Sequence, residues 1–264
     1  MSKNKAIAEF YNEHCADEEC RLTSQSTEYL VTKILIANII KQHSKILDLG
    51  GGTGVYAIPL CCDGNDVTLV DLSKNELEIA SQKADSLGCP IKIVEGDAST
   101  YNDGVLYDAV LCLGPLYHCS SMNDVEQIIH NVLNCLRNGG YAFFSFVSKY
   151  AKFNRFVNEI NSYERHKIPK INEILKSRTQ DESTFIFESR GKLPISLVEP
   201  LSLSQFFESF DVDIIETLSI DLCNKIEDFN NDIFDILCGL GKGCMINNGE
   251  HVISIVQKKS YAGD

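Results

Sequence analysis

A cluster of glycines follows a short apolar run near residue 50 and forms the strongest chemical signal in the chain. Lys45-Ile-Leu-Asp-Leu-Gly-Gly-Gly-Thr-Gly54 places Gly50, Gly52 and Gly54 at alternate positions, directly before a stretch with helical spacing. Glycine lets a backbone turn tightly and approach a ligand closely, and the first turn of a helix offers unpaired N–H groups. The turn therefore predicts a site for an anionic or zwitterionic ligand. A dinucleotide and S-adenosylmethionine are the two nucleotide-type cofactors that fit.

The glycine spacing separates these two cofactors. The dinucleotide motif G-x-G-x-x-G needs a third glycine, but that position is Val55 when counted from Gly50 and Ala57 when counted from Gly52. The spacing is D-x-G-x-G-x-G instead, with Asp48 two residues before the first glycine. Asp48 is expected to hold either the loop itself or the ammonium group of the cofactor. An NAD-dependent oxidoreductase remains an alternative, disfavoured by this spacing.

Carboxylates also end the next two apolar runs. Asp71 lies about 20 residues after the glycines, where an acid can accept both ribose hydroxyls of a nucleotide, and Leu72 would then lie against the adenine ring. Asp97 can accept a hydrogen bond from an adenine amino group, while Ala98 and Leu113 offer backbone and packing to the same ligand. Plainer roles stay open, since Asp71 also suits a helix N-terminus and Asp97 suits a turn.

Tyr117 and His118 are the candidate catalytic pair. They follow the apolar run Tyr107–Leu113, at the edge of the predicted sheet where ligands bind. A histidine near neutral pH can take a proton from a substrate hydroxyl or amine. The alternative is that His118 orders the loop and touches no substrate.

The elements that position these residues alternate between strand-like and helix-like patterns. Short apolar runs separated by helical stretches predict βαβ units and a parallel sheet covered on both faces, that is, a doubly wound α/β fold. The strand-like runs are 45–49, 66–70, 90–94, 107–113, 141–147, 212–218 and 251–257.

Four regions follow from this pattern. Residues 1–43 are expected to form an N-terminal helical cap and residues 44–148 the Rossmann-like core. Residues 149–192 are polar with helical spacing and carry ten Lys or Arg against six Asp or Glu, which predicts an inserted lid over the substrate. That basic segment either attracts an anionic group of the substrate or is simply a solvated face. Residues 193–264 are expected to complete the core sheet.

Charge and cysteine content restrict the partners. A net charge of −13 opposes nucleic acid or an anionic membrane as the main partner. The eleven cysteines include no C-x-x-C pair, and no His/Cys/Asp/Glu spacing indicates a metal site. We therefore expect reduced thiols, no metal and a cytoplasmic protein. The oligomeric state is not predicted.

The motifs, taken together and in order, resemble those of the class I S-adenosylmethionine-dependent methyltransferases over roughly residues 45–147. ILDLGGGTG is similar to the family's first motif, VDLS to its ribose-binding acid and EGDAS to its adenine-binding turn. LGPLYH, together with Tyr11, Arg21-Leu22, Glu28 and Thr32, resembles a bacterial branch of small-molecule methyltransferases.

The resemblance implies a seven-stranded sheet of order 3-2-1-4-5-7-6 with the seventh strand antiparallel. It also implies S-adenosylmethionine as cofactor, S-adenosylhomocysteine as product and in-line methyl transfer to a small-molecule acceptor. Tyr11, Arg21 and Thr27 would then form a lid over the cofactor. A non-catalytic scaffold that keeps the cofactor fold is the remaining alternative.

Overall fold

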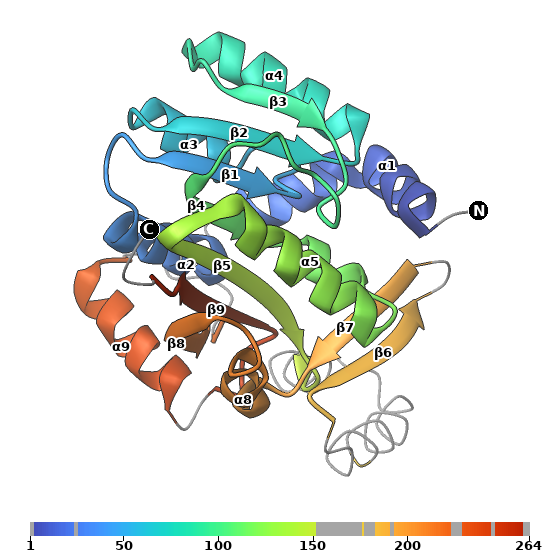
Figure 1. Cartoon of the computed structure of the whole chain (residues 1–264), viewed down its shortest axis with the longest axis vertical. Coiled ribbons are helices and arrows are strands. Elements are labelled where there is room, and N and C mark those ends of the chain that lie inside the picture. Colours follow the sequence, from blue (N-terminus) through green and yellow to red (C-terminus); the bar gives the residue numbers. More distant parts are fainter. Residues whose placement is uncertain are drawn as a thin grey trace.

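The computed structural model describes residues 3–23, 26–151, 176, 183–190, 193–222, 229–243 and 246–260; of residues 15–23 and 190 only the backbone is described (Figure 1). The helices are α1 (Lys3–Thr23), α2 (Thr27–Ile39), α3 (Ala57–Cys62), α4 (Lys74–Leu87), α5 (Met122–Cys135), α8 (Leu203–Phe207) and α9 (Asn231–Lys242). The strands are β1 (Lys45–Leu49), β2 (Asp66–Asp71), β3 (Lys92–Glu95), β4 (Tyr107–Cys112), β5 (Leu136–Ser148), β6 (Phe185–Arg190), β7 (Leu193–Val198), β8 (Val212–Ser219) and β9 (His251–Lys258). Within these ranges, no helix is long and apolar enough to cross a membrane.

Seven of the strands form a continuous sheet in the order β3-β2-β1-β4-β5-β9-β8. The first five are parallel to one another, and β9 runs antiparallel to both β5 and β8. The predicted α/β fold is therefore confirmed, including the antiparallel strand that the chain forms last.

A hairpin of β6 and β7 branches from the end of β5 and raises the sheet to nine strands. Val147 and Ser148 pair with Leu197 and Val198, whereas the preceding residues of β5 pair with β9. The expectation of a helical segment over 149–192 is thus wrong for Phe185–Arg190, which pairs with β7 along its whole length and begins with Phe-Ile-Phe, residue types that favour strands. Residues 152–175, 177–182 and 191–192 of the predicted lid lie outside the described residues.

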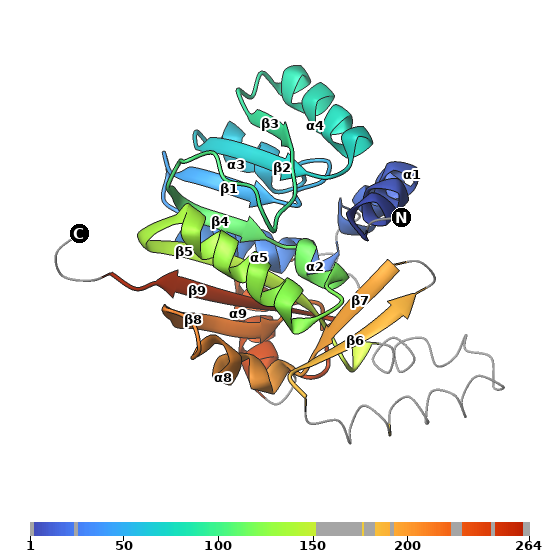
Figure 2. The ribbon, with the colours of Figure 1, turned by 45° about the vertical axis from the view of Figure 1, so that its right-hand side comes forward.

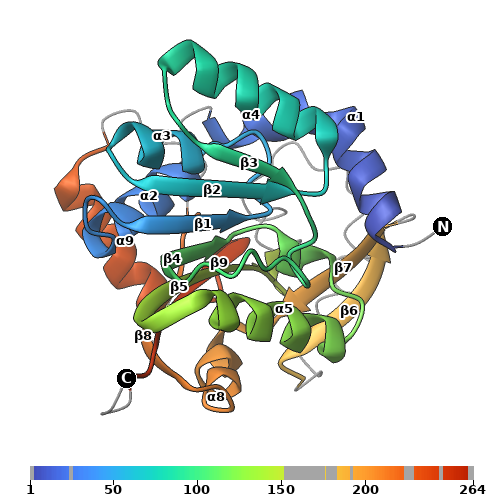
Figure 3. The same ribbon diagram turned by 45° about the horizontal axis from the view of Figure 1, so that its top comes forward.

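Helices cover both faces of the sheet (Figure 3). One core contains α5 and α8, and the other contains α2, α3, α4 and α9. In α5 the buried residues Val125, Ile128, Ile129 and Val132 recur every three or four positions, so one stripe of the helix faces the strands. The helices of successive βαβ units change face where the strand order reverses, between β1 and β4.

Helix α1 lies across the carboxyl edge of the parallel strands (Figure 2). At its amino end, Lys3 Nζ lies 2.7 Å from Asp124 Oδ2 on α5. Farther along, Asn12 Oδ1 accepts a hydrogen bond of 2.8 Å from Ser73 Oγ, the N-cap of α4. The helix therefore joins the amino ends of two helices on opposite faces of the sheet. The other helix of the predicted cap, α2, packs on the sheet itself.

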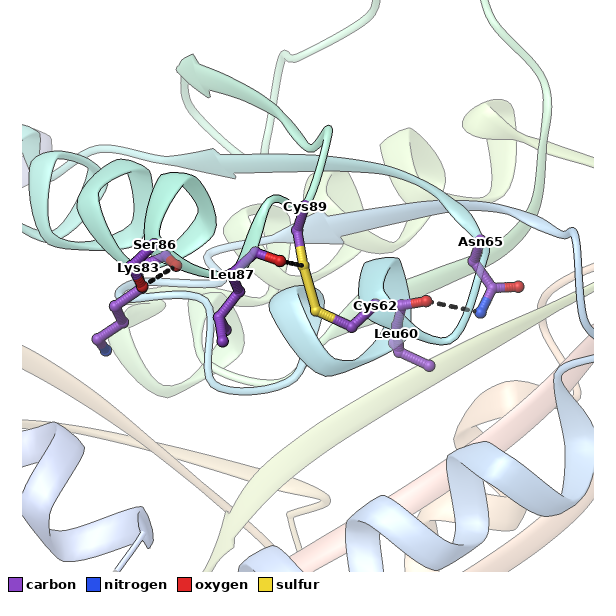
Figure 4. The surroundings of a disulfide bond; sticks show 7 residues. All are labelled: Leu60, Cys62, Asn65, Lys83, Ser86, Leu87 and Cys89. Atoms are coloured by element: carbon purple, nitrogen blue, oxygen red, sulfur yellow. Dashed lines mark hydrogen bonds between the residues drawn. A yellow bond between two sulfur atoms is a disulfide. The ribbon is translucent and has the colours of Figure 1, made fainter.

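Cys62 and Cys89 form a disulfide that joins the end of α3 to the turn after α4 (Figure 4). The expectation of reduced thiols is wrong for this pair, because the two helices bring cysteines 27 residues apart to a Cα separation of 5.7 Å. Among the described cysteines, five buried ones are free: Cys61, Cys112, Cys119, Cys135 and Cys238.

Candidate active site

A cavity of about 500 Å³ lies beneath α1 at the carboxyl edge of the sheet. Most of the predicted site residues line it. They are Tyr11, Asp48, Gly50, Gly52, Asp71, Leu72, Asp97, Ala98, Leu113, Tyr117 and His118. Residues that follow four different strands therefore converge on one space, as the parallel topology requires.

Two predicted residues lie outside this group, and the side chain of a third is not described. Gly54 has φ +78°, and a Cβ there would lie 2.8 Å from Ile58 Cδ1, so it permits close packing of α3 and does not face the cavity. Thr27 is 1% exposed at the start of α2, outside the cavity lining. The side chain of Arg21 lies outside the described residues.

The glycine turn brings its backbone close to the loop after β4 and to Asp48 in β1. Gly50 has φ +73°, and a Cβ at this position would lie 2.6 Å from Pro115 Cγ. A Cβ on Gly51 would lie 2.6 Å from Asp48 Oδ2. Glycine is therefore required at Gly50 by both conformation and space, and at Gly51 by space alone.

Asp48 places an unpartnered carboxylate oxygen in the floor of the cavity. The residue is 2% exposed, lines the cavity, and its Oδ2 has no hydrogen-bond partner. Burial, together with the charge of Asp71, raises the pKa of Asp48 to about 7. A cationic group of a ligand would favour the ionised form of this carboxyl and would give its Oδ2 atom the partner that it lacks.

Asp71 and Asp97 are each held in place by donors from their own turn and from another element. Asp71 accepts from Gly52 N at 2.9 Å and Ser73 N at 2.8 Å. Burial nevertheless raises the pKa of Asp71, against the opposing effect of these backbone donors. Asp97 Oδ1 accepts from both the backbone N and the Oγ of Ser99, each at 2.8 Å, and Asn4 of α1 donates to its Oδ2.

Tyr117 and His118 lie in the 3₁₀ turn Pro115–His118, after β4. The Tyr117 hydroxyl is 2.6 Å from Ser145 Oγ on β5. His118 Nδ1 lies 3.1 Å from the carbonyl oxygen of Pro194, which can only accept, so Nδ1 carries a proton. In the neutral ring Nε2 is then the acceptor, and the Tyr11 hydroxyl donates to it at 2.9 Å.

The cavity lining also contains a polar group that the sequence motifs did not predict as site residues. Glu28 and Thr32 line the cavity from α2, and Ser145 lines it from β5. Glu28 and Thr32 contributed to the family resemblance, but their place in the cavity depends on how α2 packs. His251 also approaches this wall, with its ring 5.7 Å from that of Tyr117.

Comparison with known proteins agrees with this geometry. Residues 46–140 match the family model of a methyltransferase domain. The chain is 28% identical over 226 residues to the ubiquinone biosynthesis O-methyltransferase of Rickettsia typhi, which covers 82% of this chain and 87% of that protein.

Two solved structures share the fold over nearly the whole chain. The Burkholderia thailandensis 1,6-didemethyltoxoflavin-N1-methyltransferase, solved with S-adenosylhomocysteine, has a TM-score of 0.64 at 12% identity and covers 98% of this chain and 92% of its own. The magnesium protoporphyrin IX methyltransferase of Synechocystis, also solved with S-adenosylhomocysteine, has a TM-score of 0.61 at 14% identity and covers 98% of this chain and 100% of its own.

The fold, the domain match and the enzymatic relatives define the class. The protein is a methyltransferase, and its fold is shared with solved methyltransferases that use S-adenosylmethionine as cofactor. The site fits this cofactor, because the unpartnered Asp48 oxygen suits a ligand that carries positive charge. The oxidoreductase and scaffold alternatives are not supported.

Proposed function

We propose that this enzyme methylates a small molecule held beneath α1, and that the acceptor atom is an oxygen. The observation that carries the proposal is that α1 crosses the mouth of a cavity of about 500 Å³ and is bonded to both α4 and α5. A cavity of this size is typical of small-molecule sites. The O-methyltransferase name of the Rickettsia relative favours oxygen as the acceptor.

The cofactor half of the cavity is assigned to the residues that follow β1, β2 and β3. Asp48 and the glycine turn would receive the amino-acid part of the cofactor, and Asp71 its ribose. Leu72, Asp97 and Ala98, with Leu113 beside them, would receive the adenine. When bound, S-adenosylmethionine supplies a methyl group activated by a positively charged sulfur. The protein's main task is then to align the acceptor with the methyl group and to exclude water. Well-oriented reactants reach effective molarities of about 10⁵–10⁸ M.

His118 is the proposed general base. A hydroxyl acceptor begins protonated, so a base that removes its proton assists transfer. The Pro194 carbonyl fixes the ring through Nδ1, which leaves Nε2 to receive the proton. In the ligand-free protein the Tyr11 hydroxyl donates a hydrogen bond to Nε2. The acceptor must therefore displace this hydroxyl or transfer its own proton to Nε2 through the hydroxyl. Tyr117 and Ser145 would orient the acceptor from the neighbouring strand.

The finer family assignment is also part of the proposal. The LGPLYH motif and the residues of α1 and α2 support the bacterial small-molecule branch named above. The acidic net charge supports the expectation that nucleic acid is not the substrate. A cytoplasmic location remains a prediction.

Two measurements test the proposal. Calorimetric binding of S-adenosylhomocysteine should weaken at least tenfold in Asp71→Ala, because the carboxylate expected to bind two ribose hydroxyls is lost. The exposed Asp213→Ala is the matched control. Equal affinity in Asp71→Ala would overturn the assignment of that half of the cavity.

The acceptor class is tested with methyl-labelled cofactor. Purified enzyme is incubated with separate small-molecule, protein and RNA fractions of a cell extract, and label should enter a small-molecule ether. Transfer confined to a protein or RNA fraction would refute a small-molecule acceptor, and label on nitrogen would refute an oxygen acceptor.

A further inference from the structure

Three potential metal ligands from separate parts of the chain meet beside the cavity. Glu28 belongs to the first turn of α2, Asp221 follows β8, and His251 begins β9. His251 Nδ1 lies 2.9 Å from Asp221 Oδ2 and 3.5 Å from Glu28 Oε2. One ligand atom from each of the three lies within 4.8 Å of the others.

These separations suit donors that share one metal ion. Zn²⁺ binds nitrogen and oxygen at about 2.0–2.2 Å. Two ligands at that distance stand about 2.9 Å apart at a right angle and about 3.4 Å apart at a tetrahedral angle. The two distances from His251 Nδ1 match these values. In the metal-free protein a proton on Nδ1 takes the place of the ion.

Burial separates this group from an ordinary surface cluster. The side chains of Glu28, Asp221 and His251 are 9%, 16% and 14% exposed. The backbone N–H of His251 donates to Asp221 Oδ1 at 2.9 Å, which fixes the orientation of this carboxylate. A largely buried pair of carboxylates needs a cation, which is supplied by protonated His251 or by a metal.

A second observation points to a ligand on the same wall of the cavity. Thr32 lies one helical turn after Glu28, and both residues line the cavity. Thr32 is 1% exposed, and its Oγ1 has no hydrogen-bond partner. A buried hydroxyl in this state is explained when a ligand or an ion-bound water provides the missing partner.

We propose that Glu28, Asp221 and His251 form a binding site for one divalent transition-metal ion, of the Mn²⁺ or Zn²⁺ type. Mixed carboxylate and imidazole ligands select such ions over Ca²⁺. Three protein ligands leave coordination positions for water or for an oxygen of the acceptor. Because Glu28 lines the cavity, the ion would lie at the acceptor end of the cavity. There it would select acceptor molecules that have an oxygen atom able to coordinate the ion. This role for the ion rests on the proposed function, whereas the ion site itself does not.

Manganese binding to the full chain tests the site without measuring activity. The protein, freed of metal by chelation, is titrated with Mn²⁺ while the electron paramagnetic resonance signal of free Mn²⁺ is followed. We expect one ion per chain, and Zn²⁺ should compete with it. His251→Gln and Asp221→Asn should each weaken binding at least about tenfold. The same substitutions at the exposed His130 and Asp213 are matched controls that should leave binding unchanged.

Spin-echo spectroscopy of the Mn²⁺ complex provides a measurement that does not depend on variants. A bound imidazole nitrogen gives a characteristic coupling, which should be present in the unmodified protein. Absence of stoichiometric binding, absence of the nitrogen coupling, or variants that bind as tightly as the unmodified protein would each overturn the metal site. The triad would then be a structural ion pair. S-adenosylhomocysteine binding, measured with excess chelator, is unaffected by that outcome, so failure of the metal site and failure of the methyltransferase assignment are distinguished.

Discussion

Replacing Asp48 with Asn should remove a pH-dependent cost from the folded protein. Burial, with the charge of Asp71, raises the pKa of this carboxyl from 3.8 to about 7. Below the unfolded pKa, the group is protonated in both states and its ionisation costs nothing. Between the two pKa values the unfolded chain loses the proton while the folded protein keeps it, so stability falls as pH rises. Above the folded pKa the full cost is present.

The size of this effect follows from the shift. About three pKa units at about 1.36 kcal/mol each give a cost of about 4 kcal/mol above pH 7. About 1.6 kcal/mol of this cost is already present at pH 5. The free energy of unfolding of Asp48→Asn, relative to the unmodified protein, should therefore rise by roughly 3 kcal/mol between pH 5 and pH 8. Urea unfolding of the cofactor-free proteins, followed by circular dichroism at several pH values, measures this difference.

The pH dependence, and not the absolute difference, is the informative quantity. A change in local packing or hydrogen bonding at position 48 shifts the difference by a constant amount at every pH. The exposed Asp85→Asn serves as the control, and its difference from the unmodified protein should stay flat. A difference for Asp48→Asn that is also flat from pH 5 to pH 8 would show that the buried carboxyl is not protonated there. The raised pKa of Asp48, and with it the cost of burying this carboxyl, would then be refuted.

Two further predictions concern the proposed base and the disulfide. His118→Gln should lower kcat by about 10²–10⁴-fold without changing the affinity for S-adenosylhomocysteine, as measured by steady-state kinetics and calorimetry; an unchanged kcat would exclude His118 as the base. Cys62→Ser should lower the free energy of unfolding by about 3.5 kcal/mol, because the bond to Cys89 closes a loop of 27 residues. Reductant should remove this difference, and a difference that persists in reductant would contradict the loop-closure explanation.

The cofactor half of the site could be predicted from the sequence because its signals are local. Gly50, Asp71 and Asp97 each lie at or just after the end of a strand, and each strand is a recognisable apolar run. In a parallel sheet the carboxyl ends of neighbouring strands meet at one edge. The order of the motifs along the chain was therefore enough to bring them together, and the structure places all three on one cavity.

The acceptor half depends on tertiary packing that no local pattern records. Glu28 faces the cavity only because α2 packs against the sheet beside it, and Asp221 and His251 are 30 residues apart in the chain. The β6–β7 hairpin was missed for a different reason. Its first strand contains only three apolar residues, Phe185-Ile-Phe187, and they follow a long polar stretch with helical spacing that dominated the interpretation of the segment.

The antiparallel direction of β9 explains how this fold can supply a histidine to the acceptor end. Parallel strands present their last residues at the ligand-binding edge, and Ser145 and Asp221 reach that edge from β5 and from the end of β8. Because β9 runs the opposite way, its first residue lies there instead, and His251 pairs with Val147 near the end of β5. A parallel strand in the same place would put its last residue, not its first, beside Glu28 and Asp221. The acceptor end of the cavity thus draws on both strand directions, whereas the proposed cofactor end draws on parallel strands.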